Sequence, residues 1–127
     1  MEPHSQINKL IYLIVKIGKL KYLYLQDNQI SYISSESFDD LNFSLKILNL
    51  AGNQLNYLNG NEFDGLNQLT VLILDRNPLK DIENIDFISS KNLPNLQLIH
   101  MYQTKILEDT NQKFIEYSKG LISLFHF

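Results

Sequence analysis

The pattern that most constrains the fold is a spacing of leucines that recurs along the chain. In residues 45–55, LKILNLAGNQL, leucine stands at relative positions 1, 4, 6 and 11, and asparagine stands at position 9. The same frame begins at Leu20 and at Leu69, and a weaker version begins at Leu96. A frame repeated at this period indicates stacked coils, in which each coil buries its apolar side chains against its neighbours.

A second column of residues supports this register independently of the leucines. A phenylalanine follows the leading leucine of each repeat by 18 residues, at Phe38, Phe63, Phe87 and Phe114. Successive leading leucines are 25, 24 and 27 residues apart, so every insertion lies between the phenylalanine and the next repeat. Surface loops tolerate such insertions, whereas strands and a phenylalanine layer must stay aligned. The frame thus gives repeats at 20–44, 45–68, 69–95 and 96–120, with 121–127 as a truncated fifth repeat.

Each repeat is expected to contribute one short strand to a parallel sheet. In the first repeat, Leu23 alternates with Tyr22 and Tyr24, so leucines point inward and tyrosines outward. The asparagines that end the strands, Asn28, Asn53 and Asn77, are expected to form a ladder that satisfies backbone groups of adjacent coils. Thr104 stands in this position in the fourth repeat, where its hydroxyl can fill only part of the role of an amide.

The ends and one insertion fit the frame less well. Residues 1–19 are interpreted as a short helix between Ser5, a good N-cap, and Gly18, or else as the tail of an earlier repeat with LIYLIV as a strand. Both alternatives stay open. A short helix is predicted over residues 110–119. The insertion in the third repeat, around residues 88–94, is expected to bulge on the convex side.

The composition limits the classes of function. With 127 residues and 44% hydrophobic residues, we expect one domain, 1–127, with its own core. The chain has a net charge of −3 and no clustered excess of lysine and arginine of the kind that phosphate binding needs. No nucleic-acid partner is therefore expected. No run of 18 apolar residues occurs, which predicts no membrane span. The lack of cysteine excludes disulfides and thiolate metal sites, and no cofactor is expected.

The repeat frame over residues 20–106 resembles that of leucine-rich repeat proteins. A phenylalanine at position 19 and a length of about 24 residues are similar to the typical subclass of Toll-like and other cell-surface receptors. The resemblance implies an α/β solenoid, a horseshoe segment with a short parallel sheet on its concave face and helical turns or loops on its convex face. It also implies recognition of a protein or peptide ligand by the concave face. Without cysteine-bonded caps and with few repeats, the chain is interpreted as a possible fragment.

The compartment stays open because two indications conflict. The repeat subclass favours a secreted or cell-surface protein. The start of the chain lacks a small-residue cleavage site, so no signal peptide is expected, and this together with the lack of cysteine favours the cytoplasm.

The variable strand positions give the candidate binding residues. On the concave side they form rows, and the first row is apolar throughout, which is typical of an interface centre. Apolar residues are also simply good strand formers, and that alternative stays open. Side chains on the convex loops, such as Ser34 and Glu62, are expected to matter neither for binding nor for folding. The predicted partner-binding residues are Tyr22, Tyr24, Gln26, Ile47, Asn49, Val71, Ile73, Asp75, Arg76, Leu98, His100 and Tyr102.

Catalysis finds little support in the sequence. No HExxH motif or glycine-rich phosphate loop occurs, and no ligand pair has a spacing useful for a metal. Asp75, His100 and Tyr102 are expected on adjacent strands, where such a trio is usually a polar patch. We therefore expect a non-catalytic binding module. The alternative is a structural fragment without a dedicated ligand, self-associating through the apolar residues 121–127.

Overall fold

The computed structural model describes residues 20–82 and 92–105. Several expectations lie outside these ranges. They are the helix or partial repeat at 1–19, the phenylalanine positions Phe87 and Phe114, the helix at 110–119 and the truncated repeat at 121–127. Most of the bulge expected around 88–94 also lies outside, because only its last residues, 92–94, are described. Within the described ranges no helix is long and apolar enough to span a membrane.

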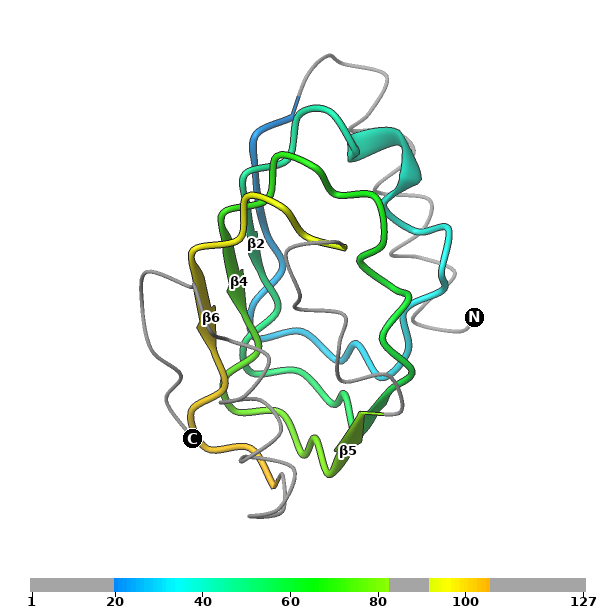
Figure 1. Ribbon diagram of the computed structural model, residues 1–127. Coiled ribbons are helices and arrows are strands. Elements are labelled where there is room, and N and C mark those ends of the chain that lie inside the picture. The colour runs from blue at the N-terminus through cyan, green and yellow to red at the C-terminus, as the bar shows by residue number, and fades with distance from the viewer. Residues whose placement is uncertain (1–19, 83–91, 106–127) are drawn as a thin grey trace.

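One strand from each repeat joins a four-stranded parallel sheet. The strands are β1 (Tyr22–Tyr24), β2 (Ile47–Asn49), β4 (Val71–Ile73) and β6 (Leu98–His100), in the spatial order β1-β2-β4-β6. Because each strand pairs in parallel with its counterpart one repeat later, the chain returns past the opposite side of the coil before it re-enters the sheet. In Figure 1 the sheet lies along one side, and the connecting coils stack beside each other across from it.

The strands alternate between the core and the surface as the sequence predicts. The central residues Leu23, Leu48 and Leu72 stand opposite one another in register and are buried, while their flanking residues are partly or fully exposed. The weaker fourth repeat keeps the same arrangement, because Ile99 and Met101 fill the positions of leucine with no exposed surface. Side chains of similar volume are thus tolerated inside the stack.

The opposite side of each coil completes the core with a phenylalanine layer. Phe38 and Phe63 are buried and stack with their ring centroids 6.2 Å apart and their planes inclined by 14°. The turn after Phe38 forms the short 3-10 helix η1 (Asp39–Leu41), and Leu41 is buried beneath it. The register given by the phenylalanines is therefore confirmed for the first two repeats.

A second, smaller sheet was not predicted. Strands β3 (Tyr57–Leu58) and β5 (Asp81–Ile82) pair in parallel on a side of the coils away from the main sheet, and β5 is labelled in Figure 1. Two residues are too few to show an alternating pattern, so the sequence gives no signal for this pairing. It is an added set of backbone hydrogen bonds between neighbouring coils.

One buried carboxylate corrects an expectation for the loops. Glu62 is only 6% exposed, and its two carboxylate oxygens accept hydrogen bonds from the amides of Asn59 at 3.0 Å and Gly60 at 2.9 Å. The amide of Ser34 donates in the same way to Oγ of Ser37, at 3.1 Å, one repeat earlier. The prediction that Glu62 does not matter for folding is wrong. The side chain just before Phe63 accepts hydrogen bonds from the backbone amides of the preceding turn.

Candidate functional site

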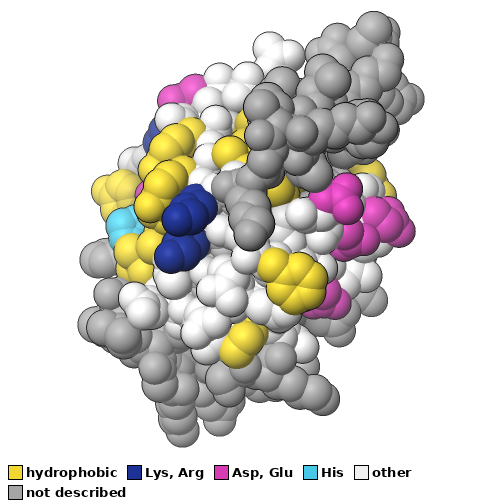
Figure 2. Space-filling view, turned by 90° about the horizontal axis from the view of Figure 1, so that it is seen from above, with side chains coloured by type: hydrophobic (Ala, Val, Ile, Leu, Met, Phe, Trp, Pro, Cys, Tyr) yellow, Lys and Arg dark blue, Asp and Glu magenta, His cyan; other side chains and the backbone are white. Residues whose placement is uncertain are grey.

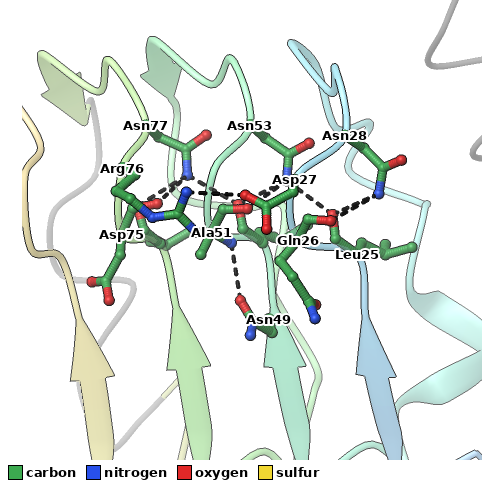
Figure 3. A network of polar contacts seen from close by, with 12 residues as sticks. Leu25, Gln26, Asp27, Asn28, Asn49, Ala51, Asn53, Asp75, Arg76 and Asn77 are labelled. Atoms are coloured by element: carbon green, nitrogen blue, oxygen red, sulfur yellow. Dashed lines mark hydrogen bonds and ion pairs between the residues drawn. The ribbon is translucent and has the colours of Figure 1, made fainter.

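The strands end at a ladder of asparagine side chains that holds the coils in register. Asn53 is buried, and its Nδ2 donates to the carbonyl oxygens of Leu25, Leu50 and Ala51 at 3.0, 2.9 and 3.2 Å. Its Oδ1 accepts from the amide of Ile30 at 3.1 Å. One side chain therefore satisfies backbone groups of its own coil and of the preceding coil, as Figure 3 shows.

Asn77 repeats this arrangement one coil later. Its Nδ2 donates to the carbonyl of Leu50 in the preceding coil and to those of Leu74 and Asp75 in its own, at 3.0, 3.0 and 3.2 Å. Its Oδ1 accepts from the amide of Leu55 at 3.0 Å. The predicted ladder is therefore confirmed at its two central positions.

The two outer positions of the ladder are weaker. Asn28 is exposed and donates only within its own coil, to the carbonyls of Leu25 at 3.0 Å and Gln26 at 3.2 Å. The described residues begin at residue 20 and so contain no coil before that of Asn28. Thr104 donates one hydrogen bond, to the carbonyl of Met101 at 3.1 Å, because a hydroxyl carries a single hydrogen.

The ladder joins neighbouring coils at the ends of the strands of the main sheet. We call the outward surface of this sheet the exposed sheet face. It consists of the twelve predicted binding residues: Tyr22, Tyr24, Gln26, Ile47, Asn49, Val71, Ile73, Asp75, Arg76, Leu98, His100 and Tyr102. Eight of them lie in β1, β2, β4 and β6, and the strand register aligns them in the predicted rows. The other four lie two or three residues after the ends of the strands. Whether this face binds a partner stays a prediction.

The first row, together with Tyr24 from the second row, forms an apolar and aromatic band. Tyr22 and Tyr24 are 52% and 57% exposed on β1, and the first row continues through the half-buried side chains of Ile47, Val71 and Leu98. In the second row the side chain of Asn49 is partly occupied, because its Oδ1 accepts from the amide of Ala51 at 3.0 Å. The band is thus a surface for packing more than for hydrogen bonding.

An ion pair crosses three coils at the end of the strands. Nη1 of Arg76 lies 3.0 Å from Oδ1 of Asp27, and both side chains are largely exposed. Between them, Gly52 has a φ of 67°, and a Cβ there would collide with the Asp27 carboxylate. Gly52 therefore leaves room for the pair in a backbone conformation that glycine adopts without strain. The repeat frame puts Asp27, Gly52 and Arg76 at the same position of successive repeats, but it does not indicate that Asp27 and Arg76 pair.

Asp75, His100 and Tyr102 come together as the sequence predicts. The amide of Tyr102 donates to Oδ1 of Asp75 at 2.7 Å, and Nδ1 of His100 lies 3.5 Å from Oδ2 of the same carboxylate. Because this carboxylate is held by a backbone amide, it fixes the ends of β4 and β6 relative to each other. The described residues contain no group of three or more histidines, cysteines or carboxylates placed to hold a metal ion.

Two lysines border the band and were absent from the predicted site. Lys21 and Lys46 directly precede β1 and β2, and both are exposed. Their backbones are aligned, because the carbonyl of Lys21 accepts from the amides of Lys46 at 2.7 Å and Ile47 at 3.1 Å. They occupy position 2 of the frame, so the repeat pattern could have indicated them, but the prediction considered only positions 3, 5, 7 and 8.

The repeat frame, the sheet and the asparagine ladder agree with what a comparison with known families finds. Residues 18–79 match the family model described as Leucine rich repeat. Residues 18–79 are built of leucine-rich repeats. The matched segment contains the two central rungs of the asparagine ladder, Asn53 and Asn77, and the strands β1, β2 and β4.

A solved structure extends this likeness. The crystal structure of a TLR13–ssRNA13 complex matches with a TM-score of 0.68 and 27% sequence identity, over 80% of this chain and 14% of that chain. This chain thus spans a small part of the length of that chain. Comparison with curated protein sequences finds no match.

Proposed function

We propose that this leucine-rich repeat chain is a non-catalytic module that binds a protein or peptide through the exposed sheet face. The observation that supports it is the band that begins at Tyr22 and Tyr24 and continues along the first row to Leu98. Leucine-rich repeats are typically interaction modules, and exposed tyrosines supply large contact areas at a low cost in conformational entropy.

The rigidity of this face favours binding without rearrangement. The strands are held by the asparagine ladder below the band, and the Asp75 carboxylate holds the end of β6 against β4. A surface that is already ordered loses little further entropy when a partner docks on it. We infer that the partner supplies most of the adjustment.

A single-stranded RNA is the competing ligand, because the TLR13 structure is described as a complex with ssRNA13. This chain covers 14% of that receptor chain, and its own net charge is −3. RNA binding draws its affinity from a surplus of positive charge along the phosphates. We therefore favour a protein or peptide and use RNA as a comparison in the test.

The test starts from a library of short random linear peptides displayed on phage and selected on the immobilised full chain. Peptides that enrich are then measured in solution against the Tyr24→Ala variant. We expect the dissociation constant to rise by roughly 30-fold, the effect of losing an aromatic anchor worth about 2 kcal/mol.

Tyr32→Ala is the matched control. Tyr32 is a tyrosine of nearly equal exposure, 55% against 57% for Tyr24, but it lies outside the sheet. Its substitution is expected to leave the affinity within about twofold, since exposed side chains away from an interface contribute little to binding. Peptides that bind the two variants equally well would place the binding surface elsewhere and refute the proposal.

A further inference from the structure

We propose that the partner of the exposed sheet face presents carboxylates to Lys21 and Lys46 beside an apolar segment that packs on the band. This inference rests on the proposed function and specifies the chemistry of the partner. It follows from three observations, which concern the two lysines, the carboxylates of the same face and the distribution of charge over the molecule.

The lysines place two positive charges at one edge of the band. Their residues are neighbours across adjacent strands, which are about 4.8 Å apart in a parallel sheet. Neither makes an ion pair with another described residue, and both side chains are exposed. Because the two backbones are this close, both ammonium groups can approach the same anionic group, which attracts each of them.

The carboxylates of the same face are already engaged. Asp27 pairs with Arg76, and the two oxygens of Asp75 face the amide of Tyr102 and the ring of His100. A cationic partner would have to compete with these contacts at the far end of the strands. The charge that is available for a partner is therefore the positive charge at the lysine edge.

The distribution of charge over the described residues strengthens this asymmetry. Figure 2 shows dark blue side chains beside the yellow side chains along the sheet side, while most of the magenta carboxylates gather on the other side. The exposed carboxylates of the convex turns include Glu36, Asp39, Asp40 and Asp64. Although the chain has a net charge of −3, an acidic partner approaching the sheet edge meets a positive surface.

These placements fix the orientation of the partner on the sheet. Its carboxylates lie at the edge where β1 and β2 begin, and its aromatic or aliphatic side chain lies a few ångströms further along, on Tyr22 and Ile47. Charged contacts at such a rim select the partner and its orientation, whereas the apolar band supplies most of the affinity. A nucleic acid would use the same lysines, but two lysines neutralise few phosphates.

The experiment uses the peptides that enrich on the full chain in the phage selection. We expect them to carry aspartate or glutamate within a few residues of an aromatic or aliphatic residue. Lys46→Glu should weaken their binding by roughly tenfold at low salt, and the effect should shrink as salt is added. Replacing the peptide carboxylate by lysine should restore binding to Lys46→Glu, which a structural role of Lys46 would not produce.

Lys80→Glu is the matched control, because it makes the same change of charge at an exposed residue outside the main sheet. Peptides that lose affinity with Tyr24→Ala but lack acidic residues and ignore Lys46→Glu would overturn this inference and leave the proposed function standing. Peptides indifferent to Tyr24→Ala, or no enrichment at all, would overturn both. A random single-stranded RNA that binds more tightly than every enriched peptide, and loses affinity with Lys46→Glu, would also overturn the inference.

Discussion

At the scale of single residues, position 9 of the repeat shows how a polar side chain becomes part of a core. Asn53 is buried because its four hydrogen bonds replace those that backbone groups of two coils would otherwise make to water. Asn28 makes two bonds in its own coil and remains exposed. The same residue type in the same position of the repeat therefore makes different hydrogen bonds, according to whether a described coil precedes its own.

This difference gives a prediction. Asn53→Leu leaves buried carbonyls and the Ile30 amide without partners, so the free energy of unfolding should fall by at least about 1–3 kcal/mol, the cost of one such group. Asn28→Leu exposes its former partners to water and should cost about 1 kcal/mol or less. Urea titrations of both variants measure the two losses. Equal losses would show that Asn53 does not bridge the coils.

At the scale of elements, each strand and turn is too short to be stable alone. Strands of two or three residues gain their stability from the neighbouring coil, and the irregular turns are held by side chains that take the place of regular backbone pairing. Glu62 is the clearest example, because it accepts from two consecutive amides, those of Asn59 and Gly60, in the turn before Phe63.

Removing this carboxylate should loosen the turn. We expect Glu62→Ala to lower the free energy of unfolding by about 1.5–3 kcal/mol, since hydrogen bonds to a charged acceptor are lost inside the protein. Glu62→Gln keeps one acceptor oxygen and should give an intermediate loss. Glu36→Ala, at an exposed position, should stay within about 0.5 kcal/mol. If chemical denaturation gave the same stability for Glu62→Ala and Glu36→Ala, the Glu62 carboxylate would not be holding the turn.

At the scale of the whole molecule, stability is transmitted from coil to coil. Leu48 has no exposed surface and stands in register between Leu23 and Leu72, so the second coil joins the first to the third. In a stacked array of this kind each coil contacts only its neighbours, and a defect in a central coil weakens the interfaces on both sides of it.

The prediction at this scale concerns a cavity in the central coil. Leu48→Ala should cost about 2–5 kcal/mol, as large-to-small changes in packed cores do. Leu20→Ala, at a partly buried position, should cost clearly less. Tyrosine fluorescence and far-ultraviolet circular dichroism should follow the unfolding of Leu48→Ala with coincident midpoints. Separate midpoints would indicate that the coils unfold independently.

The sequence alone determined the register of the coils, the inward leucines and the rows of the exposed sheet face. It could do so because these features depend on a period of two within a strand and on a frame that repeats along the chain, both of which are visible in one dimension. Tyr22 and Ile47 fall in one row for this reason, and the strand pairing confirms it. The binding role of that row stays a prediction.

Only the tertiary structure decided which polar side chains outside the asparagine ladder became structural. The burial of Glu62, the pairing of Asp27 with Arg76 over Gly52 and the small sheet of β3 and β5 were all absent from the prediction. Each depends on the distance between atoms of different coils or on the path of a turn between two strands. A repeat frame aligns equivalent positions of the repeats, but it fixes neither the distance between side chains of different coils nor the path of a turn. These contacts therefore follow from how the coils stack and not from the sequence pattern within a single coil.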